Sequence, residues 1–303
     1  MLKKLRPIIS LVLLACALAI GIYYLVAHRS LLKQLAHIHP AVVALVLILY
    51  TIMFGALYVI LAASLRLCRQ KLGAMENAKL NAHSLLINFF IPGQAGPAYR
   101  GAYLYKRHQL RVKNYVIVTL LYYVFYAVVS VFLLLVAKLP WWQTLGALVV
   151  VAALGLIAIR KYSARTKVRT DSLNLNPANI SYLFLATILQ AVVQITIYAV
   201  ELHSANSHIS MSQILTYTGA ANLALFVALT PGAIGIRESF LIFTEHLHHI
   251  SSANIIFANV IDRSVYLVFL LILVAITAAW HVRNKLKLRK LSSIKLGLAK
   301  PNR

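Results

Sequence analysis

The chain has 303 residues, of which 61% are apolar and only 12% are charged, and its mean hydropathy is +0.80. A soluble domain of this length needs far more charged surface, so the composition excludes an ordinary globular protein. The formal net charge is +24. The basic residues lie in short runs between apolar blocks, without interleaved stacking aromatics, which is typical of membrane topology signals and not of nucleic-acid binding. We expect a membrane protein with no nucleic-acid partner.

Six apolar blocks are about 20 residues long, the length with which a helix crosses the hydrocarbon core of a bilayer. They cover residues 7–27, 41–64, 115–137, 142–159, 180–200 and 254–280. Two shorter apolar stretches, 80–92 and 214–231, each end at a Pro-Gly pair. The sequence therefore predicts an all-α polytopic protein, a single integral membrane domain over residues 1–303 with six full spans.

The distribution of Lys and Arg predicts the orientation. Of the 30 basic residues, 25 fall before the first span, in the segments 66–79, 100–113 and 160–169, or after the last span, and all of these can face the cytoplasm. Basic loops stay on the cytoplasmic side. We therefore expect a multi-pass protein of the bacterial cytoplasmic (inner) membrane with both termini inside, and a basic cytoplasmic tail over residues 282–303.

The same distribution predicts that the two short apolar stretches are re-entrant hairpins. Segments 66–79 and 100–113 are both basic, so residues 80–99 must enter and leave by the inner face; by the same parity, residues 214–250 must return to the outer face. Both hairpins carry P-G-x-x-G, at an offset of 139 residues that also relates the span starts at 41 and 115 to those at 180 and 254. We expect an inverted repeat of residues 1–139 and 140–281, an architecture common in secondary transporters.

The two Pro-Gly motifs are candidate anion sites. Proline and glycine break a helix, and the N–H groups that start the next half-helix carry partial positive charge that suits an anion. An arginine follows each motif closely enough to add contacts. The candidate residues are Pro92, Gly93, Gly96 and Arg100 in the first hairpin and Pro231, Gly232, Gly235 and Arg237 in the second. The alternative is that the glycines allow tight packing and the arginines reach the headgroup layer.

Few other charged residues fall inside apolar segments, and such residues usually mark a pathway or a structural ion pair. Glu238 follows Arg237, and Asp262 and Arg263 lie early in the last span. Both interpretations stay open: a substrate path, or structural pairs of Arg263 with Glu238 and of Arg237 with Asp262. We expect Glu201, at the outer end of a span, to be solvated.

The sequence offers little for catalysis. It contains six acidic residues in all and lacks the common nucleotide-binding and nucleophile motifs. We predict no catalytic residues, no metal site and no cofactor, and we do not expect an enzyme.

At the two hairpins the sequence resembles the transmembrane region of lysylphosphatidylglycerol synthases, a flippase-like membrane family. The resemblance rests on residues 88–96, beginning with Asn88 and followed by Arg100, on residues 229–238, and on Arg263 before a tyrosine-containing span. It implies movement of an aminoacylated lipid between leaflets, while a separate soluble domain performs the lysyl transfer. Only the short basic tail follows the last span here, so lysyl transfer is not implied. Relatives often carry an acidic-basic pair where this chain has Tyr122 and Tyr123.

These observations lead to one main hypothesis and two alternatives. The main one is a translocase for an anionic lipid headgroup, a phospholipid or a polyprenyl phosphate, with membrane lipids as its partners. The second is a membrane-embedded glycosyl- or phospho-transferase acting on a lipid carrier. The third is a non-transporting scaffold that partners a lipid-modifying enzyme.

Overall fold

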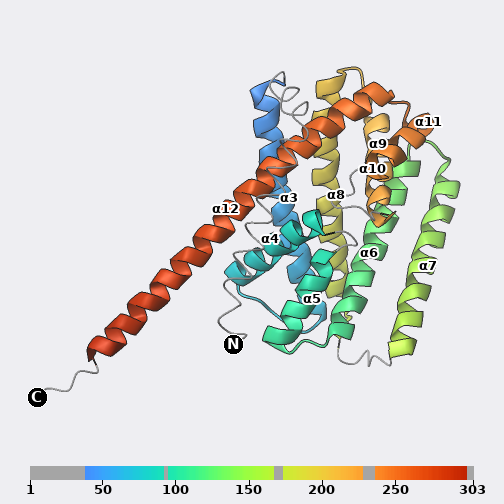
Figure 1. Cartoon of the computed structure of the whole chain (residues 1–303). Helices are drawn as coiled ribbons and strands as arrows, with labels where there is room; N and C mark the ends of the chain where they lie inside the picture. The colour runs from blue at the N-terminus through green and yellow to red at the C-terminus, as the bar shows by residue number, and fades with distance from the viewer. Residues whose placement is uncertain (1–37, 92–94, 167–172, 228–235, 299–303) are drawn as a thin grey trace, which may run out of the picture.

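A computed structural model of the chain describes residues 38–91, 95–166, 173–227 and 236–298, and every regular element in these ranges is a helix (Figure 1). The long helices are α3 (Pro40–Leu67), α6 (Val112–Leu135), α7 (Trp141–Thr166), α8 (Pro177–Ala205) and α12 (Ser252–Leu298). The shorter elements are α4 (Ala74–Phe90), α5 (Ala95–His108), α9 (Met211–Ala224), the 3₁₀ turn η2 (Leu225–Val227), α10 (Ile236–Phe243) and α11 (Glu245–His248).

Five of these helices are long and apolar enough to cross a membrane: α3, α6, α7, α8 and the part of α12 up to Trp280. They coincide with five of the six predicted spans, which confirms an all-helical, multi-pass protein. The first predicted span, residues 7–27, lies outside the described residues. The total number of spans and the re-entrant course of the two hairpins stay predictions.

Local signals in the sequence explain where several helices begin. Pro40 and Pro177 occupy the first turns of α3 and α8, where the missing N–H is not needed. The side chain of Asn176 accepts a hydrogen bond from the Asn179 N–H and so caps α8. Ser210 and Gln213 form a capping box at the start of α9. These caps fix the helix starts.

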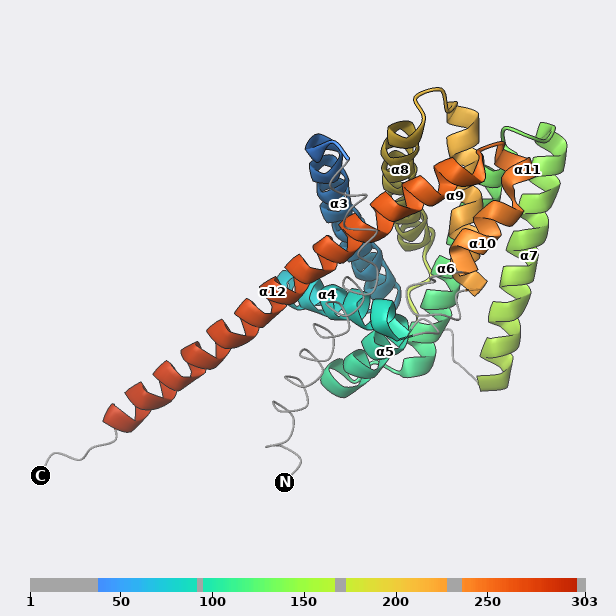
Figure 2. The same ribbon diagram turned by 45° about the horizontal axis from the view of Figure 1, so that its top comes forward.

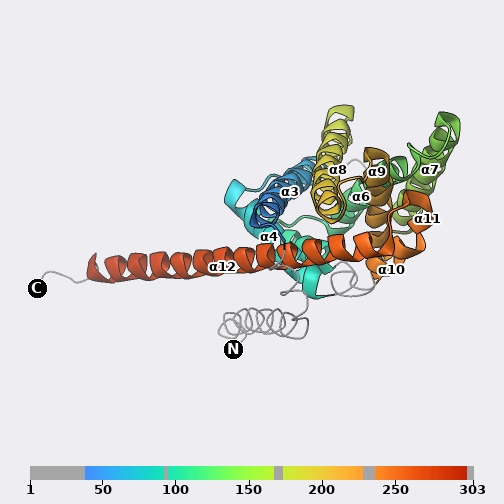
Figure 3. The same cartoon turned by 90° about the horizontal axis from the view of Figure 1, so that it is seen from above.

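Two helices from different halves of the chain, α3 and α8, pack side by side, and α6 packs between α7 and α9 (Figure 1). Helix α12 crosses α3, α4 and α8 diagonally (Figure 2). Seen from above, α12 lies along one side of the bundle and extends well beyond it (Figure 3). Helix α12 continues without a break through the start of the predicted tail at residue 282 and ends at Leu298. No proline occurs between residues 252 and 300 to interrupt it.

The second half of the chain repeats the helix order of the first. Helices α3, α4, α5 and α6 correspond to α8, α9, α10 and α12, and the starts of each pair are separated by close to the 139-residue offset of the two motifs. In Figure 1, α3 descends while α8 rises, and α6 rises while α12 descends. The pair α4 and α5 lies in the lower half of the bundle, and the pair α9 and α10 in the upper half. Corresponding helices therefore run in opposite directions.

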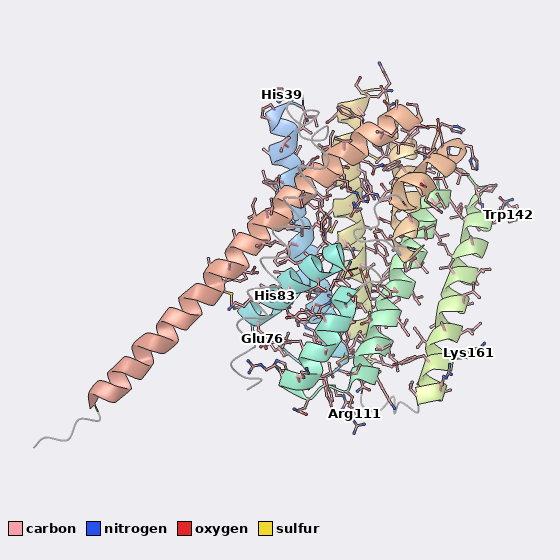
Figure 4. All side chains as sticks on the ribbon, in the orientation of Figure 1. His39, Glu76, His83, Arg111, Trp142 and Lys161 are labelled. Carbon is pink, nitrogen blue, oxygen red and sulfur yellow. The ribbon has the colours of Figure 1, made fainter. Side chains whose placement is uncertain are left out.

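The basic residues gather at one end of the bundle. Figure 4 labels Arg111 and Lys161 at the lower end, and His39 and Trp142 at the upper end. At the lower end the Lys113 ammonium donates to the Thr166 carbonyl at 2.8 Å, which joins the start of α6 to the end of α7. This charge asymmetry is the pattern on which the predicted orientation rests.

Candidate functional site

A cavity of about 300 Å³ lies where the two short-helix pairs meet the long helices. Residues from α3, α4, α5, α6, α8, α10 and α12 line it, so both halves of the chain contribute to its wall. Its charged lining residues are Arg100, Arg237, Asp262 and Arg263. The arginines of the two hairpins, which are 137 positions apart in the sequence, therefore share one cavity.

Arg237 and Asp262 form a buried ion pair at this wall. The Arg237 Nη1 lies 2.5 Å from Asp262 Oδ2, and the two residues are only 5% and 3% exposed. The Tyr50 hydroxyl donates to the other carboxylate oxygen of Asp262. The Arg237 guanidinium also lies over the ring of Tyr198, 5.1 Å from its centroid. Cation–π contact and two hydrogen bonds to Asp262 hold this group of residues in one arrangement.

Arg237 keeps hydrogen-bonding capacity that the ion pair does not use. Its Nε and Nη2 are buried, and neither makes a hydrogen bond to a described residue. A buried N–H without a partner is unfavourable by about 1–3 kcal/mol, and more for a charged group. Donors of this kind at a cavity wall are suited to an anionic oxygen.

Arg100 reaches the same cavity from the second turn of α5, which begins at Ala95. Its Nη1 donates to Asn81 Oδ1 at 3.4 Å, and its Nε has no partner among the described residues. Asn88, a predicted site residue, also lines the cavity. The predicted Arg100 and Asn88 thus lie together with Arg237, Asp262 and Arg263.

Gly96 has a packing role. A Cβ at this position would lie 2.5 Å from the Ser84 carbonyl oxygen, so only glycine lets α5 approach α4 this closely. The Gly96 N–H points to Asn88 Oδ1 at 3.4 Å, which occupies one of the N–H groups predicted to face an anion. At Gly96 the geometry therefore favours the alternative interpretation, in which the glycine allows tight helix packing.

The remaining predicted site residues are only partly covered. Pro92, Gly93, Pro231, Gly232 and Gly235 lie outside the described residues. Glu238 lies on α10, but its side chain is outside the described part, so its predicted pairing with Arg263 stays a prediction. The predicted pairing of Arg237 with Asp262 is present.

The expectation for Glu201 is wrong. Helix α8 continues past residue 200 to Ala205, so Glu201 lies within the helix and not at a solvated end. Its side chain is 1% exposed and lies close enough to Asp262 and Arg237 for their charges to act on it. Among the described residues, however, no group of three or more His, Cys, Asp and Glu side chains could hold a metal ion.

Sequence reasoning also missed the polar face of α8 and the tyrosines that surround the cavity. Gln190, Gln194 and Tyr198 follow one another at intervals of four, which places them on one side of a helix, and all three line the cavity. The Tyr122 hydroxyl donates to Gln190 Oε1 at 2.9 Å. A polar stripe at helical spacing within an apolar span was the signal that could have found them. The cavity tyrosines are Tyr50, Tyr122, Tyr123, Tyr126, Tyr198 and Tyr266.

Fold and site together define a class: a multi-pass helical membrane protein with an arginine-rich, tyrosine-lined cavity between two halves of similar helix order. The family model described as the lysylphosphatidylglycerol synthase TM region matches residues 8–273. The chain therefore belongs to this family, which confirms the resemblance drawn from the two hairpins. The search of curated proteins gave no significant match.

Proposed function

We propose that the protein is a translocase that carries an anionic lipid headgroup across the cytoplasmic membrane. The observation that carries this proposal is the pair of arginines that line the cavity, Arg100 and Arg237. The Nε of each, and the Nη2 of Arg237, are buried without a hydrogen-bond partner among the described residues. Cationic groups in a low-dielectric site attract an anion more strongly than they would in water. A phosphate-bearing headgroup supplies negative charge and accepts several hydrogen bonds at once.

A second cavity favours a lipid over a soluble anion. It has a volume of about 230 Å³, lies between α6 and α7, and is lined by apolar side chains such as Leu120, Val124 and Val151. Tyr123 and Phe226 line both cavities, so the apolar space adjoins the charged one. A lipid whose headgroup lies at the arginines and whose acyl chain lies between α6 and α7 would fill both cavities.

The two halves of the chain supply a basis for alternating access. The repeated helix order, the opposite directions of corresponding helices and the charge asymmetry support an inverted repeat with both termini cytoplasmic. Each half contains a pair of short helices, and both pairs contribute to the cavity. We propose that these pairs are re-entrant hairpins, and that rocking of one half against the other exposes the headgroup to each face in turn.

Reconstitution in liposomes tests this function. Fluorescent phosphatidylglycerol and phosphatidylcholine are placed in both leaflets, and an impermeant quencher follows their exchange. We expect phosphatidylglycerol to cross faster than in protein-free liposomes. We expect Arg100→Ala to slow this movement, and Arg160→Ala, at an exposed position on α7, to leave it unchanged. If no lipid crosses faster than in protein-free liposomes, the proposal fails. A full rate in Arg100→Ala would show that Arg100 does not bind the headgroup.

A further inference from the structure

Glu201 is a buried carboxyl group to which the proposed function assigns no role. It lies on α8 with 1% exposure, and neither of its oxygens has a hydrogen-bond partner among the described residues. The titratable and charged groups around it come from α3, α8, α9, α10 and α12. They are Tyr50, Tyr198, Tyr217, Arg237, Asp262 and Arg263. Among the described residues, the nearest charges are therefore one carboxylate and two guanidinium groups.

The carboxyl group of Glu201 lies near that of Asp262. Glu201 follows Tyr198 by less than one turn of α8, and the Arg237 guanidinium that lies over the Tyr198 ring is paired with Asp262. Two ionised carboxylates in a low-dielectric site repel each other, and neither can donate a hydrogen bond. Asp262 is the one held as a carboxylate, because Tyr50 and Arg237 both donate to it. A proton between the two carboxyl groups therefore belongs on Glu201, which then donates toward Asp262.

This proton changes the charge that a ligand meets at Arg237. With Glu201 protonated, Arg237 and Asp262 balance each other. Ionisation of Glu201 adds one negative charge beside this pair, which opposes an anion beside Arg237. The unpaired Nε and Nη2 of Arg237 are then available for an anion chiefly when Glu201 is protonated. Proton binding and anion binding favour each other, and this linkage is reciprocal.

We propose that Glu201 is a proton-binding site, and that the anionic headgroup binds at Arg237 together with one proton. The reaction is simple: the Glu201 carboxylate accepts a proton and becomes a carboxylic acid, and no other bond changes. The inference rests on the proposed function and deepens it, because co-binding makes the proton gradient a source of energy for moving the lipid.

Isothermal titration of the purified protein with short-chain phosphatidylglycerol, in buffers of different ionisation heat, counts the protons taken up per lipid. We expect about one proton in the wild type at a pH where Glu201 is ionised, and none in Glu201→Gln, which mimics the protonated form. Wild-type affinity should fall as the pH rises, by up to about tenfold per pH unit, because one proton binds with each lipid. Affinity in Glu201→Gln should stay constant. Glu245→Gln changes a carboxylate on α11 that accepts a hydrogen bond from Ser252, and this variant should behave as the wild type.

A wild type that binds lipid without proton uptake at any pH overturns the inference and leaves the proposed function standing. Proton uptake of equal size in the wild type and in Glu201→Gln would also overturn the inference and leave the proposed function standing. If phosphatidylglycerol does not bind at all, the proposed function and the coupling fail together. The infrared carbonyl band of a protonated carboxyl group then reports on Glu201 alone. At a pH below that at which lipid binding takes up a proton, the band should be present in the lipid-free wild type and missing in Glu201→Gln. A wild type without the band overturns the assignment of the proton, even if the variant does not fold.

Discussion

At the scale of single residues, the pair of Arg237 and Asp262 shows how a buried charge is tolerated in this protein. Each partner removes the cost of burying the other, and Tyr50 and Tyr198 supply further contacts to the pair. Isolated charges inside a membrane protein are unfavourable, so such residues are paired, serve a pathway, or do both. The pair therefore combines the two interpretations that the sequence left open.

We predict that removing one partner of this pair is much worse than removing both. Arg237→Gln should destabilise the protein by about 3–5 kcal/mol, because it leaves Asp262 charged and buried. The double variant Arg237→Gln with Asp262→Asn should recover most of this loss. Unfolding in denaturing detergent measures both effects. Equal stability losses in the single and double variants would show that the ion pair does not govern folding here.

His248 lies in the turn between α10 and α12 and is held in its neutral form. Its Nε2–H donates to the Leu241 carbonyl at 3.0 Å, and its Nδ1 accepts from the Ile250 N–H at 3.2 Å. A protonated ring could not accept the second bond. Burial lowers the pKa of His248 below its ordinary value. Its stabilising effect is therefore complete above the unfolded pKa, about 6.5, and is lost as the pH falls toward the lower folded pKa.

We expect the turn around Ile250 to open as the pH falls from about 7.5 to about 5, which brackets the unfolded pKa of histidine. Hydrogen exchange of the Ile250 amide, corrected for the intrinsic rate at each pH, measures this opening. His248→Phe should remove the pH dependence, and His208→Phe, at an exposed position, should keep it. An unchanged pH dependence in His248→Phe would assign the effect to another group.

At the scale of helices, close approach depends on a few glycines. A Cβ on Gly219 of α9 would lie 2.4 Å from the Leu134 nitrogen and 2.6 Å from the Ser130 carbonyl oxygen, both in the backbone of α6. No rotation of a side chain can relieve contacts with backbone, so the two helices would have to separate. Small residues at such contacts allow tight packing of helices in membranes.

We predict that Gly219→Ala destabilises the protein by about 1–3 kcal/mol through overpacking. The matched control is Gly55→Ala on α3, where a Cβ meets nothing within 4 Å. This variant should be neutral or stabilising by up to about 1 kcal/mol, because alanine favours the helix. Thermal unfolding in detergent compares the two. A stable Gly219→Ala would mean that α6 and α9 can move apart freely.

The apolar cavity between α6 and α7 gives a second prediction at this scale. Ala127→Phe fills a position in its wall and should slow the movement of long-chain phosphatidylglycerol severalfold. Binding of a short-chain analogue should be little changed, because the arginines are untouched. Ala153→Phe, an exposed position on α7 outside the cavity lining, is the control. An equal loss for short and long chains would place the effect at the headgroup.

At the scale of the whole molecule, the proposed orientation in the membrane rests on the basic end of the bundle. In a cysteine-free background, we expect Lys161→Cys to react with an impermeant maleimide only after cells are permeabilised, because positive loops stay inside. His208→Cys, in the loop between α8 and α9, should react in intact cells. The reverse pattern of labelling would invert the proposed topology and the direction of proton coupling.

Much of the architecture could be predicted from the sequence, because a bilayer imposes simple requirements on a chain. An apolar run of about 20 residues must be a helix, and positive charge between such runs orients it. Five described helices coincide with predicted spans for this reason. The Pro-Gly pairs, together with the basic segments of the chain, likewise indicate the two pairs of short helices, α4 with α5 and α9 with α10.

The site was predicted only in part. Arg100, Arg237 and Asp262 stood out because charges in apolar segments are rare, and all three line the cavity. The solvated position expected for Glu201 is wrong because the predicted span ends at residue 200, five residues before the end of α8. The tyrosines were missed because an aromatic residue in a span has no distinctive meaning until its neighbours are known.

The sequence by itself therefore determined the class of protein, the five described helices that are long and apolar enough to span a membrane, and the charged residues within apolar segments. Those properties depend on local length and polarity, which can be read along the chain. Only the tertiary structure decided that Glu201 is buried near Arg237 and Asp262 and that arginines from the two halves share one cavity. Such pairings depend on how α3, α8 and α12 pack, and packing depends on the fit of whole surfaces and not on any single segment.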